Sequence, residues 1–303
     1  MAFTAKDVQN LRERTGCGMM DCKKALTEAG GDMEKAIELL REKGLAAQAK
    51  KSGRIAAEGI VYTYVDEAKK VGVVIEVNAE TDFVAKNESF QSFVASCAKA
   101  VAEQNPATVE ELMACKADDQ FTVEEALREK ILTIGENMKI RRFARYEGEV
   151  VTYSHGGGRI GVMVKFDAPA DIAAKDGFKA MAKDVAMQVA AANPTYLDKA
   201  GVPADEIAKE KEILTQQAIN EGKPANIAEK MVMGRINKYY KEVCLLEQPF
   251  IKDGDITVSK YIENCAKELG GEIKAVSFVR FEKGEGLEKR EDNFADEVAS
   301  IMK

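Results

Sequence analysis

The chain has 303 residues, of which 46% are hydrophobic and 31% charged, a balance that is ordinary for a globular protein of two or three domains. Its formal net charge of −7 argues against nucleic acid and against anionic membrane surfaces as main partners, because both need a basic surface. No apolar run approaches the roughly 18 residues of a membrane span, and the N-terminus shows neither a signal core nor a transit pattern, so we expect a cytoplasmic location.

Six cysteines and a single histidine do not predict a metal site or a disulfide framework. The cysteines are scattered over positions 17, 22, 97, 115, 244 and 265, and no two of them form a CxxC pair. Scattered thiols of this kind are typical of a reducing compartment. We therefore expect neither a metal nor a cofactor.

Residues 1–54 predict a module of three short helices followed by a linker. Thr4 is a favourable cap for the first helix, and a second helix is expected over 19–29. A Gly-Gly-Asp turn ends the second helix, and Asp32 can cap the third. The alanine- and lysine-rich stretch 46–53 is expected to be the linker. This arrangement is similar to ubiquitin-associated modules, and a core so small is marginal alone.

The next part of the chain contains one pattern twice, over residues 58–147 and again over 147–282. Without a gap, residues 58–87 and 147–176 are identical at eleven of thirty positions. Each copy predicts two strands rich in β-branched and aromatic residues, an amphipathic helix, a further helix and a closing strand. The duplication implies two similar subdomains packed as a pseudo-symmetric pair, each with a small antiparallel sheet.

The elements expected within this pattern can be placed by residue number. In the first copy, strands are expected over 60–65, 71–77 and 138–145, and a helix over 124–134. In the second copy, helices are expected over 173–192 and 259–269, and a strand over 272–281. Helices combined with small antiparallel sheets are typical of an α+β fold.

Five units are expected in all. The three-helix module is followed by a first core subdomain over 55–147, and the second core subdomain comprises 148–196 and 246–280. Within the second, the insert 197–245 carries two charge-rich helices joined by a Gly-Lys-Pro turn, which predict an antiparallel coiled-coil hairpin. A C-terminal amphipathic helix is expected within 281–303.

The sequence offers few candidate catalytic residues. The one histidine, His155, stands in the glycine-rich segment 154–159 between two predicted strands, and a nucleophile–histidine–acid triad would have to use it. Phosphate-binding glycine loops connect a strand to a helix, so this segment does not predict a nucleotide site. It is either a solvated hairpin loop or a contact for a partner, and we predict no catalytic residue.

Met19 and Met20 open a predicted helix directly after a Gly-Cys-Gly segment. Methionine suits adaptable protein–protein surfaces, so the pair could face a partner. In so small a bundle, one or both could equally belong to the core.

The tripeptide Thr81-Asp82-Phe83 is present only in the first copy. It follows a predicted strand and precedes a helix, so it should lie on a connecting loop, where binding residues concentrate. The second copy has Asp171 and Ile172 at the last two of these positions. The shared aspartate could cap the following helix in both copies, and phenylalanine against isoleucine could be ordinary variation of a core residue.

Two longer motifs are RERTG at 12–16 with MMDCKKAL at 19–26, and EVNAETDFVAKN at 76–87. The first resembles the N-terminal signature of the bacterial elongation factor Ts family, and the second resembles the second signature of that family. Further along, 223–232 and 248–250 match the same family. The resemblance covers essentially the whole chain.

This resemblance implies a guanine-nucleotide exchange factor for elongation factor Tu in translation, which is not an enzyme. In that family the aspartate–phenylalanine pair is inserted near the nucleotide–magnesium site of the GTPase, where the phenylalanine wedges between two helices. The N-terminal module and the C-terminal helix grip the same GTPase, and the second subdomain supports further contacts. The partner-binding residues implied here are Arg12, Met19, Met20, Lys23, Thr81, Asp82, Phe83, Val84 and His155.

Two details depart from the family pattern. The family's histidine loop usually reads His-Gly-x-Arg, whereas here one residue more separates His155 from Arg159. A relative has a second histidine on the following helix, where this chain has Gln188. Some relatives dimerise through the inserted hairpin, so a homodimer through 197–245 is a further expectation, beside a second GTPase contact or a spacer.

Two other classes of function stay open on the sequence alone. A binding adaptor with a ubiquitin-associated-like module would hold its GTPase equally well with and without nucleotide, unlike an exchange factor. An unrecognised enzyme would need a catalytic group that the sequence does not display.

Overall fold

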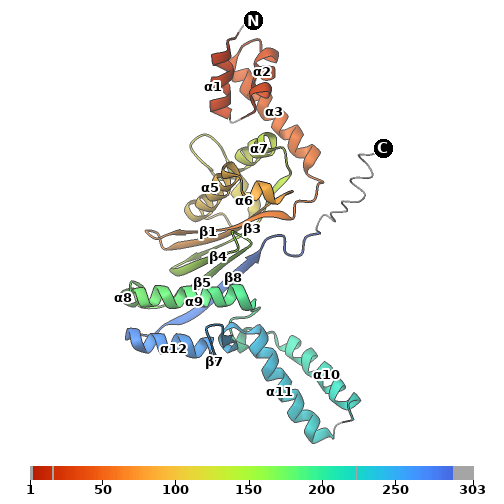
Figure 1. Ribbon diagram of the computed structural model, residues 1–303, viewed down its shortest axis with the longest axis vertical. Coiled ribbons are helices and arrows are strands. Elements are labelled where there is room, and N and C mark those ends of the chain that lie inside the picture. The colour runs from red at the N-terminus through yellow and green to blue at the C-terminus, as the bar shows by residue number, and fades with distance from the viewer. Residues whose placement is uncertain (1–2, 16, 223, 289–303) are drawn as a thin grey trace.

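The computed structural model describes residues 3–15, 17–222 and 224–288 of the chain (Figure 1). The molecule is elongated and of mixed α+β structure, with the N-terminal helices at one end, a helical hairpin at the other and two small sheets between them (Figure 1). The helix expected within 281–303 falls mostly on residues 289–303, which lie outside the described residues.

Three helices form the N-terminal module: α1 (Ala5–Thr15), α2 (Met19–Glu28) and α3 (Met33–Lys51). Asp32 caps α3 as predicted, because its carboxylate accepts hydrogen bonds from the backbone N–H groups of Glu34 and Lys35. At the start of α1, the hydroxyl of Thr4 likewise accepts a hydrogen bond from the backbone N–H of Asp7 at 3.3 Å. The small core of the module consists of Val8, Leu11, Cys17, Cys22, Ala25, Leu26, Ala36 and Leu40.

The prediction of a linker over 46–53 is wrong for most of that range, because α3 continues to Lys51. Alanine and lysine favour a helix, and the extended part of α3 packs along α7 (Val123–Ile134). In this contact Gln48 Oε1 accepts a hydrogen bond from Arg128 Nε at 3.3 Å. The longest helix of the module therefore attaches the module to the first sheet unit.

Within the described residues, the two copies fold as two separate three-stranded antiparallel sheets. Their strand orders are β1 (Glu58–Asp66), β2 (Val71–Ala79), β3 (Met138–Glu147), and β4 (Glu149–His155), β5 (Ile160–Asp167), β8 (Lys274–Glu282). A third, short sheet pairs β6 (Pro249–Phe250) with β7 (Asp253–Thr257). The predicted strands are confirmed to within two residues at each end.

Helices cover the outer face of each sheet (Figure 1). The first sheet carries α7 with α4 (Asp82–Ala85), α5 (Glu88–Gln104) and α6 (Val109–Ala114); the second carries α8 (Ala170–Ala173), α9 (Asp176–Ala192) and α12 (Val258–Leu269). The helices predicted over 124–134 and 259–269 are confirmed as α7 and α12. The helix predicted over 173–192 begins three residues later, because a separate turn, α8, precedes it.

The inner faces of the two sheets pack directly against each other. Buried side chains of this interface are Val61, Val74, Met163 and Phe281. Glycines stand at equivalent places in the two copies: a Cβ added at Gly72 would lie 2.5 Å from Val150 Cγ1, and one at Gly161 would lie 2.4 Å from Val61 Cγ1. These contacts leave no room for a side chain, so the two glycines set how closely the sheets approach.

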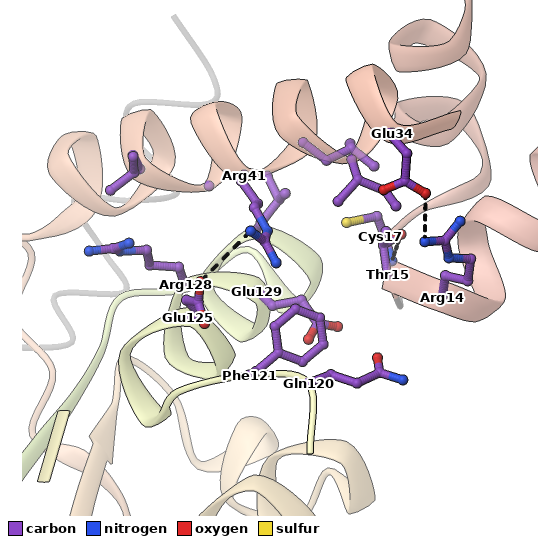
Figure 2. A pocket seen from close by; sticks show the side chains of 15 residues that line it. Arg14, Thr15, Cys17, Glu34, Arg41, Gln120, Phe121, Glu125, Arg128 and Glu129 are labelled. Atoms are coloured by element: carbon purple, nitrogen blue, oxygen red, sulfur yellow. Dashed lines mark hydrogen bonds and ion pairs between the residues drawn. The ribbon is translucent and has the colours of Figure 1, made fainter. Parts of the chain in front are cut away.

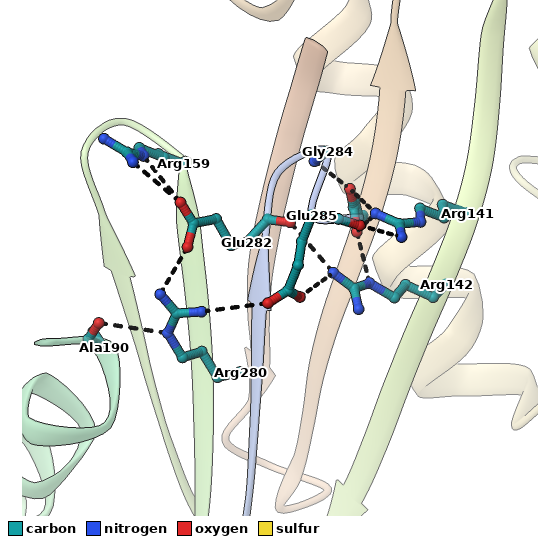
Figure 3. A network of polar contacts seen from close by, with 9 residues as sticks. Arg141, Arg142, Arg159, Ala190, Arg280, Glu282, Gly284 and Glu285 are labelled. Atoms are coloured by element: carbon teal, nitrogen blue, oxygen red, sulfur yellow. Dashed lines mark hydrogen bonds and ion pairs between the residues drawn. The ribbon is translucent and has the colours of Figure 1, made fainter. Parts of the chain in front are cut away.

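A buried glutamate connects the first sheet to the end of the last strand. Glu76 on β2 is fully buried and forms ion pairs with Arg142 at 2.6 Å and Arg141 at 3.1 Å, both on β3. It also accepts a hydrogen bond from the backbone N–H of Gly284 at 2.8 Å. A buried carboxylate is costly unless it is paired and hydrogen-bonded, and these partners supply both. On the side of the second sheet, Figure 3 shows the network continued by Arg159, Arg280, Glu282 and Glu285.

The insert in the second copy forms the predicted antiparallel hairpin, with α10 (Ala204–Asn220) and α11 (Ala225–Val243). Its seam is a narrow apolar line of Leu214, Ala218, Val232 and Ile236. Two 3₁₀ turns, Lys199–Gly201 and Leu245–Glu247, connect the hairpin to the second subdomain.

Replacing Gly161 by alanine tests the close contact between the sheets. We expect Gly161→Ala to lower the free energy of unfolding by about 1–3 kcal/mol, because the added methyl group would overlap Val61. Denaturant unfolding measures the change. Gly234→Ala on α11 is the matched control, since nothing lies within 4 Å of its added Cβ, and it should stabilise by about 0.5–1 kcal/mol. Equal effects of the two substitutions would contradict the close packing.

Candidate functional site

Asp82 and Phe83 lie on the one-turn helix α4, at a place where the sequence predicted a loop. Phe83 is 78% exposed, the largest fraction among the exposed large apolar residues of the described chain. A short helix at the end of a buried strand thus presents an aromatic ring to solvent.

The backbone around Phe83 is held from several directions. On the N-terminal side, the carboxylate of Glu136 accepts hydrogen bonds from the backbone N–H of Thr81 at 3.0 Å and from its hydroxyl at 2.7 Å. On the C-terminal side, Asn87 caps α5. Val84 was expected at the partner surface, but it is only 5% exposed and packs in the core of the first sheet unit. Val84 therefore anchors α4 in the core, whereas its neighbour Phe83 is exposed.

Asp82 forms an ion pair with Lys86 one turn later, at 2.9 Å. The hydrogen bond from this lysine lowers the pKa of Asp82, so the carboxylate stays ionised at neutral pH. The ammonium of Lys86 also lies 6.0 Å from the centroid of the Phe83 ring. Asp82 does not cap the following helix, since Asn87 does, and in the second copy α9 has no side-chain cap. The capping explanation of the shared aspartate is therefore wrong.

The equivalent residue of the second copy has the opposite environment. Ile172 is 3% exposed and belongs to the core of the second sheet unit. Phe83 and Ile172 are therefore not two variants of one core residue. The structure separates them into an exposed side chain in one copy and a buried one in the other.

Met19 and Met20 lie in the first turn of α2 and are 43% and 61% exposed, so the pair faces solvent and not the core. Arg12 and Lys23 are exposed as well. Arg12 and Met19 border the same shallow depression, of about 410 Å³, together with two further side chains of α1. The structure thus brings the predicted N-terminal contact residues to the surface of the first two helices.

His155 is the exposed last residue of β4, and its Nδ1 lies 3.0 Å from the hydroxyl of Tyr153. The glycines that follow form the predicted hairpin turn. This turn is not freely solvated, because the carbonyl of Gly158 accepts a hydrogen bond from the backbone N–H of Val61 at 2.8 Å. A Cβ at Gly158 would lie 2.2 Å from Cγ1 of Ile60, so the turn rests on β1 of the first sheet.

Gln188, the residue that replaces a histidine of a relative, is 1% exposed. Its amide donates to Gln248 Oε1 at 3.1 Å, and its own oxygen accepts from the backbone N–H of Ile251 at 2.8 Å. These bonds connect α9 to the segment around β6. Gln188 supports the second subdomain from within and is not part of a contact surface.

A cavity of about 390 Å³ lies where α3 meets α7 (Figure 2). Its charged side chains are largely paired with one another, as in Arg14 with Glu34 at 3.0 Å and Arg41 with Glu125 at 3.9 Å. Figure 2 shows Glu129 beside the ring of Phe121, and burial raises the pKa of this glutamate. The apolar part of the lining consists of Ile37, Leu40, Leu45, Phe121 and Leu132.

Two buried thiols are poorly suited to nucleophilic chemistry. Burial raises the pKa of Cys17 to about 11 and the pKa of Cys97 to about 12, so both remain protonated at neutral pH. In the part of the chain that the structure describes, no group of three or more His, Cys, Asp or Glu side chains could hold a metal ion. No helix of that part is long and apolar enough to cross a membrane.

Comparison with known proteins shows the family of the chain. The family model described as Elongation factor TS matches residues 80–285, a range that begins just before α4. The chain is 58% identical to Elongation factor Ts of Clostridium perfringens (strain SM101) over 304 residues, and to that of Clostridium botulinum (strain Eklund 17B) over 303 residues, with 99% of each chain covered. It is 57% identical to Elongation factor Ts of Clostridium kluyveri over 301 residues, which cover 98% of this chain and 97% of that one.

Proposed function

Because this chain belongs to the elongation factor Ts family, whose members exchange the nucleotide of elongation factor Tu, we propose that Asp82 and Phe83 open the nucleotide–magnesium site of that GTPase. Family membership makes the chain a non-catalytic exchange factor of translation elongation, which works in the cytoplasm. The observation that carries the proposed role of α4 is the 78% exposure of Phe83 on an ordered helix.

An exchange factor works by binding the nucleotide-free GTPase more tightly than the nucleotide-bound form. Accelerating nucleotide release ten-thousand-fold requires about 5.5 kcal/mol of such differential binding. Burying one phenylalanine side chain supplies about 1.5–3 kcal/mol. Phe83 alone is therefore not sufficient, and other surfaces must hold the GTPase while α4 acts.

The arrangement of α4 suits the insertion of a wedge. Its backbone is fixed by Thr81, Val84 and the cap at Asn87, so little conformational entropy is lost when Phe83 enters a partner. Asp82 carries a negative charge beside it, which near a bound magnesium ion would disturb the ion's coordination.

Two further surfaces contribute to binding of the GTPase. On the N-terminal module, Met19 and Met20 offer adaptable apolar contacts, and Arg12 and Lys23 offer positive charges nearby. His155 adds a polar contact at the end of β4. The likeness of the three N-terminal helices to ubiquitin-associated modules fits a protein-binding role of this part.

A binding adaptor is the alternative function, and family membership argues against it. An adaptor would bind elongation factor Tu equally with and without nucleotide. Release of a fluorescent GDP analogue from elongation factor Tu, followed by stopped flow, distinguishes the two, since only an exchange factor accelerates the release.

Replacing Phe83 by alanine should lower the maximal rate of GDP release by one to two orders of magnitude, because about 1.5–3 kcal/mol of apolar burial is lost. Stability should change by no more than about 0.5 kcal/mol, since the ring is exposed in the free protein. Stopped flow and thermal unfolding measure the two effects.

Ile172→Ala is the matched control in the second copy. It should cost about 2–5 kcal/mol of stability, because Ile172 is in the core, while the folded protein keeps its exchange activity. The wedge role of Phe83 would be refuted by an exchange defect in folded Ile172→Ala as large as that of Phe83→Ala.

Replacing Met20 by alanine should act on affinity and not on the maximal rate. The half-saturating concentration should rise by about half to one order of magnitude, because only part of the side chain's apolar burial is lost. Titration of the exchange rate with increasing protein concentration measures both quantities. A lowered plateau at an unchanged half-saturating concentration would place Met20 in the opening step instead.

We also propose that the α10–α11 hairpin pairs two copies of the chain. Its outer surface exposes Ile213 (52%), Ile219 (56%) and Met233 (63%). Light scattering should then give about twice the 33.2 kDa of one chain, and Ile219→Glu with Met233→Glu should return the mass to that of a monomer. A monomeric wild-type protein would refute the pairing. Weakened binding of elongation factor Tu by the double variant would then indicate a second GTPase contact, and unchanged binding a spacer.

A further inference from the structure

Glu136 lies in the turn that ends α7, yet its side chain acts at the start of α4. It directly follows Gly135, which ends α7 in the left-handed conformation with φ of 88°. Its two carboxylate oxygens accept the backbone N–H and the hydroxyl of Thr81, at 3.0 Å and 2.7 Å. In the same turn, the backbone N–H of Asn137 donates to Glu80 at 2.5 Å. The turn after α7 therefore holds both residues that precede Asp82.

Hydrogen bonds to a charged acceptor are stronger than hydrogen bonds between neutral groups. Because Thr81 donates two such bonds to one carboxylate, both its position and its orientation are fixed. Thr81 stands at the N-cap position of α4, but its side chain makes no capping bond to the helix. Its hydroxyl is used by Glu136 instead. The direction in which α4 leaves the sheet thus depends on a residue from another element of the fold.

The second copy lacks a contact equivalent to that between Glu136 and Thr81, and an apolar contact stands in its place. There Gly270 ends α12 in the same left-handed conformation, with φ of 80°, and the next residue is Gly271 where the first copy has Glu136. A Cβ added at Gly271 would lie only 2.8 Å from Cγ1 of Ile172. Ile172 therefore packs over this glycine. The residue equivalent to Thr81 is Ala170, which has no hydroxyl to bond.

We propose that Glu136 is a positioning residue for nucleotide exchange: it fills the place where the second copy buries Ile172, and by holding Thr81 it keeps Phe83 turned outwards. It acts through Phe83 and does not itself touch the GTPase. This inference rests on the proposed function of Phe83. Glu136 and its bond with Thr81 are then the reason why Phe83 is exposed while Ile172, at the equivalent corner of the second copy, is buried.

The orientation of residue 83 can be measured without any partner. The chain contains no tryptophan, so Phe83→Trp introduces a single fluorescent reporter. In otherwise unchanged protein its emission should be that of an indole in water, and acrylamide should quench it readily. Adding Glu136→Gly, the residue of the second copy, should shift the emission to shorter wavelength and reduce quenching. Unchanged emission and quenching in the folded double variant would overturn the proposal.

The effect on exchange is measured by release of a fluorescent GDP analogue from elongation factor Tu. Glu136→Gly should lower the maximal rate about tenfold, the equivalent of one or two lost hydrogen bonds, with less than a twofold change in the half-saturating concentration. Glu136→Gln keeps the size of the side chain and one acceptor, so it should lose less. A purely structural role would instead reduce thermal stability and leave the rate of the folded protein unchanged, which would overturn the proposal.

A double-mutant cycle separates this inference from the function on which it rests. In a Phe83→Ala background, Glu136→Gly should cause a much smaller further loss of rate than the tenfold loss it causes alone, because Phe83 is the main side chain that it orients. A full additional tenfold loss would overturn the proposal. If Phe83→Ala itself exchanges normally, the proposed function fails, while the tryptophan emission still decides whether Glu136 orients residue 83.

Discussion

Close packing between the two sheets is the constraint on which the rest of the structure depends. Each sheet has helices on one face, so its other face leaves water only by packing against the other sheet. Gly72 and Gly161 permit this contact, and Glu76 is buried beside it with its arginine partners. Because β2 is buried along its whole length, the helix that follows it has a fixed position. The α4 helix and the turn after His155 are therefore carried by a rigid body.

The duplication accounts for the place of the proposed contact surface as well as for how the scaffold is built. Both copies have the same strand order, and threonines cap α7 and α12 at equivalent positions. At one corner the first copy has Thr81, Phe83 and Glu136, and the second has Ala170, Ile172 and Gly271. In the second copy these residues make an ordinary core contact. In the first they make a polar anchor and an exposed ring, so the same scaffold supports packing in one copy and, in the proposed function, recognition in the other.

The contact surfaces proposed above would act together on one GTPase, and the fold connects two of them physically. The exposed methionines of α2 belong to the module whose longest helix, α3, packs along α7. Lys51 near the end of α3 donates to the carbonyl of Ile131 on α7 at 3.3 Å. The turn that ends α7 contains Glu136, which holds Thr81. In the proposed function, binding through the module would place α4 at a defined distance from the same partner, and fixed geometry of this kind reduces the entropy cost of the second contact.

The sequence by itself determined the kind and the limits of most elements, because those signals lie within a few residues of what they define. Runs of β-branched and aromatic residues predicted the strands, Asp32 predicted the start of α3, and the repeat predicted two similar sheets. The motifs also predicted the family. Only the tertiary structure decided which side chains are covered: Phe83 and Ile172 occupy equivalent places in the pattern, yet one is exposed and the other buried. The physical reason is that burial depends on neighbours supplied by distant segments, such as Glu136, which lies 55 residues after Thr81.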